Sequence, residues 1–154
     1  MDIGELLARD GVVLRSGASS KRQALHVVAE AAAVSLGLPE ARIMEALLER
    51  EALGSTGLGS GVAVPHARIE GLDHVLAVFV RLDTPVAFGA VDDRPVDLLF
   101  ALFAPPRAGA EHLRALAAVS RALRSPELRE HLRKARTPDA IHALFVREAP
   151  ATAA

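Results

Sequence analysis

The sequence predicts a single α/β domain, a β-sheet flanked by helices on both faces. Along the 154 residues the predicted order is one strand, two helices, several strands and then three helices. Two strand-like runs, Val75–Leu82 and Val96–Ala104, are almost continuously apolar, which is typical of strands covered on both faces. This length suits one domain with its own core, and no repeat or linker divides it. We expect the domain to span residues 1–148, with a disordered tail at 149–154.

The first third of the chain predicts one short strand and two helices. Val12–Leu14 is a short apolar strand candidate before a turn rich in serine. Ser20 begins a capping-box pattern, and apolar residues then keep helical spacing until Gly37 ends the segment. Pro39 suits the first position of a second helix, which has Arg50 in its last turn.

A glycine-rich segment follows the second predicted helix. Residues 54–61 read GSTGLGSG, which is too flexible for a helix and too poor in side chains for a central strand, so we predict a loop. Val62–Val64 should be extended, because a residue before proline is disfavoured in the helical region. His66 is therefore expected just past the end of a strand.

The second half predicts three strands and then three helices. A weaker strand candidate, Pro85–Phe88, lies between the two apolar runs. The first of the three helices has His112 in its first turn. The other two are expected to begin at Pro126 and Pro138, each preceded by a capping residue, Ser125 or Thr137. The residues with helical spacing in the first of these helices are Leu113, Leu116, Ala117, Ser120 and Leu123. The residues expected to face inward in the other two are Leu128 and Leu132, then Ile141, Leu144 and Phe145.

Composition excludes several classes of protein. The chain has no Cys, so disulfides, thiolate zinc sites and thiol nucleophiles are excluded. The net charge of −1 gives no positive surface for nucleic acid, and five scattered Phe without Tyr or Trp offer few aromatic rings for base stacking. The sequence therefore does not indicate a nucleic-acid-binding protein. The first residues lack the pattern of a secretory signal, and no apolar run approaches the roughly 18 residues of a membrane span. We expect a cytoplasmic protein without membrane insertion.

The glycine-rich loop does not match a nucleotide-binding fingerprint. Gly57 and Gly59 begin a G-x-G-x-x-G pattern, but Val62 occupies its sixth position, and no P-loop Lys-Ser or Lys-Thr follows. The loop still offers unhindered backbone amides and the hydroxyls of Ser55 and Thr56, groups that bind oxyanions such as phosphoryl groups. A merely flexible connection is the alternative interpretation of the loop alone.

His66 is the strongest candidate for a reactive group. His26, His74, His131 and His142 have surface-like or structural surroundings in the sequence. His66, in contrast, follows a proline at a strand end, directly after the loop. Its neutral imidazole can attack phosphorus, while the loop groups and Arg50 would meet the phosphoryl oxygens.

His112 also follows a strand end, that of the run finishing at Ala104, so both histidines are expected along one sheet edge. As a first-turn residue, His112 should fill little of the core. Two histidines also suggest a metal site, but no H-x-H or H-E-x-x-H spacing and no third ligand accompany them. We therefore predict a phosphate site, without a metal or another cofactor.

The segment Arg50–Ile69, REALGSTGLGSGVAVPHARI, resembles the active-site segment of fructose/mannitol-type enzyme IIA proteins of the bacterial phosphoenolpyruvate-dependent sugar phosphotransferase system. Three later segments resemble the same family in order and spacing: RPVDLLFALFAP, HLRALAAVSRAL and LREHLRKA. The chain most resembles the nitrogen-regulatory branch, because no membrane or carrier domain is attached to it.

This resemblance implies a mixed sheet and a phosphotransferase component that carries phosphohistidine. His66 corresponds to the residue that accepts a phosphoryl group, through Nε2, from an HPr-like phosphocarrier. His112 corresponds to a second histidine that would orient the phosphoryl group or stabilise its charge, and Arg50 to an arginine that contacts the site. Ser55 and Thr56 correspond to loop positions, and their chemistry suggests hydrogen bonds to phosphoryl oxygens.

Three outputs of such a protein are open at this stage. The first is regulation of target proteins, such as sensor kinases or transporters, by the phosphorylation state of His66. The second is sugar-specific transport, with the phosphoryl group passed to a permease IIB domain. The third is a protein-interaction module that works without phosphate.

Overall fold

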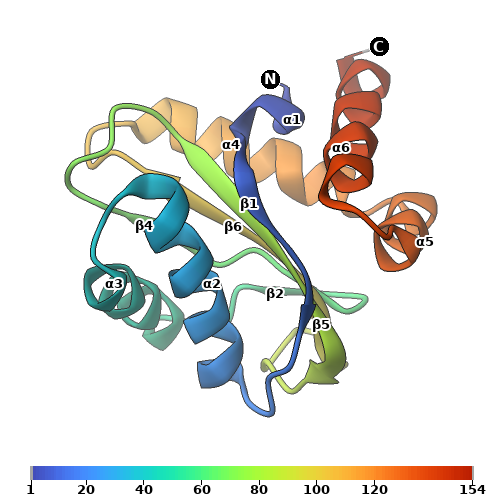
Figure 1. The fold of residues 1–154 in the computed structure, drawn as a ribbon, viewed down its shortest axis with the longest axis horizontal. Coiled ribbons are helices and arrows are strands. Elements are labelled where there is room, and N and C mark those ends of the chain that lie inside the picture. Colours follow the sequence, from blue (N-terminus) through green and yellow to red (C-terminus); the bar gives the residue numbers. More distant parts are fainter. Residues whose placement is uncertain (1, 154) are drawn as a thin grey trace.

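A computed structural model describes residues 2–153, and Met1 and Ala154 lie outside the described residues. The described chain folds into a six-stranded sheet with helices on both sides (Figure 1). In chain order the elements are α1 (Ile3–Leu6), β1 (Leu7–Ser16), α2 (Lys21–Leu36), α3 (Glu40–Ala52), β2 (Gly57–Gly59), β3 (Val62–Ala63), β4 (His66–Arg68), β5 (Leu76–Val86), β6 (Val96–Ala104), α4 (Gly109–Ala122), α5 (Pro126–Lys134) and α6 (Pro138–Ala153).

The sheet is mixed, as the family resemblance implies. Its strand order is β1-β5-β6-β3-β2, and β4 also pairs with β6. β5 pairs antiparallel with β6 and parallel with β1, while β3 and β4 both run parallel to β6. The short β3 and β4 thus share one long neighbour, and the two residues between them, Val64 and Pro65, lead directly into His66.

Two apolar layers hold the sheet, one on each face. Helices α2 and α3 cover one face, and α1, α4, α5 and α6 cover the other (Figure 1). Residues of β6 alternate between the layers: Leu98, Phe100, Leu102 and Ala104 face α4 to α6, and Leu99, Ala101 and Phe103 face α2 and α3. All seven are at most 1% exposed, which explains why this strand reads as a continuous apolar run.

The predicted helix ends are confirmed with one shift. The Ser20 hydroxyl accepts from the Gln23 N–H at 3.1 Å, and Gly37 ends α2 with a positive φ of 68°. Ser125 caps α5 in the same way. Pro39 precedes α3 as its capping residue instead of occupying the first helical position, because its φ and ψ are extended.

Several strand boundaries differ from the prediction. β1 is Leu7–Ser16 instead of Val12–Leu14, because pairing with β5 extends it into polar sequence. β5 continues through the turn-like Asp83–Pro85 to Val86, so no separate strand Pro85–Phe88 forms. Part of the predicted loop 54–61 pairs with β3 as β2. His66 begins β4 instead of lying beyond a strand.

The apolar pattern of α4 agrees with its buried face only in part. Leu123 is buried and Leu116 packs against the core, but Leu113 is 64% exposed, and Ala117 is exposed as well. The buried residues within α4 are His112, Ala115, Val119 and Ala122. The difference arises because leucine outweighs alanine and histidine in a hydrophobic pattern, whereas here alanine and histidine are among the residues that face the core.

No helix in residues 2–153 is long and apolar enough to cross a bilayer. Residues 149–153 of the tail that the sequence predicts as disordered belong to α6, and Ala154 lies outside the described part of the chain.

Candidate active site

His66 lies at the start of β4 and is held there by the neighbouring strand. The Pro65 carbonyl accepts from the Leu102 N–H at 2.9 Å, and His66 pairs with Leu102 in the parallel ladder. The side chain is half-buried. Pairing with β6 therefore fixes the backbone of His66, while part of the imidazole stays accessible.

Both ring nitrogens of His66 have partners. Nδ1 lies 2.9 Å from the Val64 carbonyl oxygen, and Nε2 lies 3.1 Å from Nε of Arg50. A carbonyl oxygen only accepts and a guanidinium only donates, so Nδ1 carries the hydrogen and Nε2 carries the lone pair. The contacts thus select the tautomer in which Nε2 is nucleophilic.

Arg50 reaches the site from the last turn of α3. Its Nη1 donates to the Gly54 carbonyl at 2.8 Å while its Nε donates to His66. The guanidinium therefore joins the start of the glycine-rich loop to the imidazole and places a permanent positive charge beside Nε2.

His112 lies beside His66, and the two ring centroids are 5.6 Å apart. The two histidines are therefore neighbours, as predicted, although His66 is in β4 and His112 is on α4. The expectation that His112 fills little of the core is wrong, because its side chain is only 4% exposed. Its Nδ1 is buried and has no hydrogen-bond partner among the described residues. An unpartnered lone pair costs less than an unpartnered N–H, so the hydrogen belongs on Nε2.

Both imidazoles are held neutral near pH 7. The pKa of His112 is lowered to about 4, mainly by burial and to a smaller extent by the neighbouring His66 and Arg68. Burial also lowers the pKa of His66 from 6.5, with Arg50 and Arg68 adding to the shift and the Val64 carbonyl and Glu51 opposing it. A neutral His66 is the form that can attack an electrophile.

The two histidines open onto one cavity of about 420 Å³ between α3, β4 and α4. The polar groups in its lining are Glu49, Arg50, His66, Arg68 and His112, and the apolar ones are Ala46, Leu53, Ala67, Leu113 and Leu116. Two guanidiniums and a neutral N–H donor around a nucleophilic nitrogen suit a dianionic phosphoryl group.

The sequence reasoning missed Arg68. This residue follows His66 by two positions on β4, and its Nη1 donates to the Pro106 carbonyl at 3.1 Å. Side chains two apart on a strand share a face, so a strand predicted to start at His66 would have identified Arg68. The sequence placed the strand end at Val64 instead.

Ser55 and Thr56 do not line this cavity. The Ser55 hydroxyl donates to the Phe88 carbonyl at 2.7 Å, and the Thr56 hydroxyl donates to the buried Glu51 carboxylate. The amides of Thr56, Gly57 and Ser60 also donate to protein oxygens. The loop therefore uses these groups to fix its own shape, and direct phosphoryl binding by Ser55 and Thr56 stays a prediction that this arrangement does not favour.

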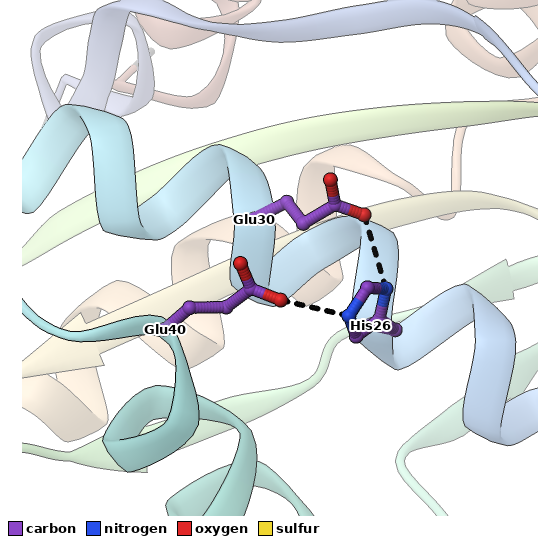
Figure 2. A group of neighbouring side chains, drawn as sticks. All are labelled: His26, Glu30 and Glu40. Atoms are coloured by element: carbon purple, nitrogen blue, oxygen red, sulfur yellow. Dashed lines mark ion pairs between the residues drawn. The ribbon is translucent and has the colours of Figure 1, made fainter.

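The other four histidines lie elsewhere. His74 and His131 are exposed, and His142 is half-buried on α6. His26 lies between Glu30 of α2 and Glu40 of α3, with one ring nitrogen 3.0 Å from the first carboxylate and the other 2.7 Å from the second (Figure 2). The two carboxylates approach opposite sides of the ring, which is the geometry of an ion-paired link between helices.

The fold and the site together define a small α/β protein with a paired-histidine centre suited to phosphoryl groups. Residues 5–148 match the family model "Phosphoenolpyruvate-dependent sugar phosphotransferase system, EIIA 2". The chain belongs to this family, and it is therefore a component of phosphoryl transfer.

Relatives and solved structures agree with this assignment. The chain is 42% identical over 154 residues to a nitrogen regulatory protein of Bradyrhizobium diazoefficiens, with 100% of both chains covered. It is 32% identical over 142 residues to a fructose-specific EIIA component of Haloferax volcanii, covering 91% of this chain and 92% of the relative. The crystal structure of nitrogen regulatory protein IIA-Ntr from Neisseria meningitidis has a TM-score of 0.87 at 35% identity, covering 93% of this chain and 98% of that chain.

Proposed function

We propose that the chain is a phosphoryl carrier and regulator of a nitrogen-related phosphotransferase system. Nε2 of His66 accepts a phosphoryl group from the phosphohistidine of an HPr-like carrier, and the phosphorylation state of His66 then controls binding to target proteins. The observation that carries this proposal is the hydrogen-bonded tautomer of His66, whose Nε2 lone pair faces a cavity with two arginines.

The transfer needs one bond to break and one to form. The phosphorus–nitrogen bond of the donor phosphohistidine breaks, and its electron pair returns to the donor imidazole. The Nε2 lone pair of His66 forms the new bond to phosphorus. Meanwhile Nδ1–H remains hydrogen-bonded to the Val64 carbonyl, and this hydrogen bond stabilises the positive charge that develops on the ring.

Three side chains meet the charge of the phosphoryl group. Arg50 releases Nε2 when the phosphorus approaches, and the same N–H is then placed to donate to a phosphoryl oxygen. Arg68 adds a second positive charge. Neutral His112 donates its Nε2–H to a phosphoryl oxygen, and this hydrogen bond needs no change in its protonation state. No metal or cofactor enters this mechanism.

The surroundings of the cavity favour a protein as phosphoryl donor. Leu53 is 85% exposed and Leu113 is 64% exposed, and both line the cavity beside the histidines. Exposed leucines around a reactive group suit a protein partner that buries them, and they contribute nothing to binding a small anion.

Sugar-specific transport is the second candidate. It is supported by the likeness to the fructose-specific component of Haloferax volcanii, whose identity of 32% is lower than the 42% to the nitrogen regulatory protein of Bradyrhizobium diazoefficiens. Onward transfer from the phosphorylated chain to a sugar permease IIB domain would favour this candidate over regulation.

The test is phosphorylation in a reconstituted system. The chain is incubated with phosphoenolpyruvate, enzyme I and an HPr-like carrier, and an acid-labile gain of one phosphoryl group is measured by mass spectrometry. We expect the gain in the wild type and in His131→Ala, a matched control at an exposed histidine, but not in His66→Ala. Absence of the gain from the wild type with the carriers of both branches would contradict the proposal.

A further inference from the structure

Glu51 is a buried carboxylate that the proposed transfer does not use. The residue is 9% exposed and lies at the end of α3, directly after Arg50. Its Oε1 is 2.8 Å from Nζ of Lys21 and 3.1 Å from the Thr56 N–H, and its Oε2 accepts from the Thr56 hydroxyl. The carboxylate is therefore fully engaged by one cation and by both donors of a single loop residue.

Lys21 is itself fixed at the start of α2. Its Nζ lies 4.5 Å from the centre of the Phe88 ring and 3.4 Å from the Phe88 carbonyl oxygen. The ion pair with Glu51 thus ties α2, α3 and the loop after α3 to one point. An ion pair in such surroundings is a weak source of stability, because removing both charges from water costs about as much as their attraction returns.

From Thr56 a short series of hydrogen bonds leads to the reactive imidazole. The Thr56 carbonyl accepts from the Val64 N–H at 3.0 Å, and the Val64 carbonyl accepts from Nδ1 of His66 at 2.9 Å. Two consecutive residues of α3 thus act on opposite nitrogens of His66. Arg50 contacts Nε2 directly, and Glu51 reaches Nδ1 through Thr56 and Val64.

We propose that Glu51 is a positioning residue for His66. By holding Thr56, it orients the Val64 carbonyl toward Nδ1 and keeps the imidazole in the tautomer whose Nε2 lone pair faces the cavity. This inference rests on the proposed function for its effect on phosphoryl transfer, but the effect on the tautomer exists in the unphosphorylated protein. The negative charge of Glu51 also opposes the lowering of the His66 pKa by the arginines.

The experiment uses Glu51→Gln, which keeps the shape of the side chain and removes its charge. The readout is the pair of ¹⁵N chemical shifts of His66 in the free protein at pH 7.5. The wild type should show one protonated Nδ1 and one unprotonated Nε2. We expect Glu51→Gln to show averaged shifts from both tautomers and to accept phosphoryl groups at least about tenfold more slowly. Glu45→Gln, at an exposed position of the same helix, should match the wild type.

A second pair of variants, at Thr56, tests the proposal independently if the Glu51→Gln protein does not fold. Thr56→Val removes the hydroxyl that donates to Glu51 and keeps the side-chain shape, whereas Thr56→Ser retains a hydroxyl. We expect mixed tautomers in Thr56→Val and the wild-type tautomer in Thr56→Ser. Wild-type ¹⁵N shifts in a folded Glu51→Gln or Thr56→Val protein would overturn the proposal. A shifted tautomer in a chain that no carrier phosphorylates would instead overturn the proposed function alone.

Discussion

The Nε–H of Arg50 donates to Nε2 of His66 at 3.1 Å, although the two residues belong to different elements, α3 and β4. The contact occupies the lone pair that attacks phosphorus in the proposed mechanism, and it opposes protonation of that nitrogen. When a phosphoryl group displaces Arg50 from Nε2, the guanidinium is already close enough to donate hydrogen bonds to the phosphoryl oxygens. The predictions below follow from this relationship and from the surroundings of the two histidines.

Arg50→Lys should slow phosphoryl acceptance by about 10- to 100-fold, because one ammonium cannot reproduce the two donors that reach His66 and the Gly54 carbonyl. Transfer rates from a phosphorylated carrier measure this effect. Arg42→Lys is the matched control, since Arg42 lies on the same helix and donates only at the surface, to the Glu70 carbonyl. Equal rates for Arg50→Lys and the wild type would remove Arg50 from the mechanism.

Phosphoryl acceptance should fall at acidic pH with a midpoint below 6.5. Only neutral His66 attacks phosphorus, and burial together with Arg50 and Arg68 lowers its pKa, whereas the Val64 carbonyl and Glu51 act against this shift. In Arg68→Gln the midpoint should move upward, because one of the charges that disfavour protonation is gone. Single-turnover rates between pH 5 and pH 8 give both midpoints, and an unchanged midpoint would contradict the electrostatic account.

The stability of the protein should decrease as the pH falls from about 6.5 toward 4. The unfolded chain binds a proton at His112 with a pKa of 6.5, but the folded chain does so only at about 4, so in that range protonation favours unfolding. Urea unfolding at several pH values measures the slope. In His112→Gln the free energy of unfolding should depend less steeply on pH than in the wild type. An unchanged pH dependence would show that other groups cause the effect.

His112→Ala should still fold but lose about 1–3 kcal/mol, because the imidazole is buried between α4 and the sheet. It should also accept phosphoryl groups poorly. His112→Gln keeps an N–H donor and should retain more transfer than His112→Ala. Equal transfer by both variants and the wild type would show that His112 has a packing role only.

Leu113→Asn should weaken transfer from a protein donor but not from phosphoramidate, a small phosphoryl donor. The leucine is exposed beside the cavity and has no polar atom to offer a phosphoryl group, so a neutral polar replacement affects docking more than chemistry. Val34→Asn, at another exposed apolar position, on α2, should transfer normally from both donors. Loss of transfer from phosphoramidate in Leu113→Asn would contradict the docking role.

Local sequence signals predicted most of the fold. Ser20, Gly37 and Ser125 act at short range, and the apolar run of β6 reports its burial directly, so these features could be read without the structure. The boundaries of β1 and β5 depend on the pairing of distant strands and could not. The buried face of α4 is built from alanine, valine and His112, whose weak apolar signal was masked by the exposed Leu113.

The site was predictable where residue chemistry alone is distinctive, and not where it depends on partners. His66, His112 and Arg50 could be selected by type and position, and the structure brings them together. The roles of Glu51 and Arg68 depend on which atoms lie near them in space. Ser55 and Thr56 show the same limit, because a hydroxyl beside a reactive histidine in sequence can still turn toward another partner.

The central claim is that Nε2 of His66 is the phosphoryl acceptor. Coupling between ³¹P and ¹⁵N in the phosphorylated, ¹⁵N-labelled protein tests it most directly, because the coupling identifies the bonded nitrogen. We predict that phosphorus is bonded to Nε2 of His66 and that Nδ1 of the same ring stays protonated and hydrogen-bonded to the Val64 carbonyl. Phosphorus bonded to Nδ1, or to any residue other than His66, would contradict the account.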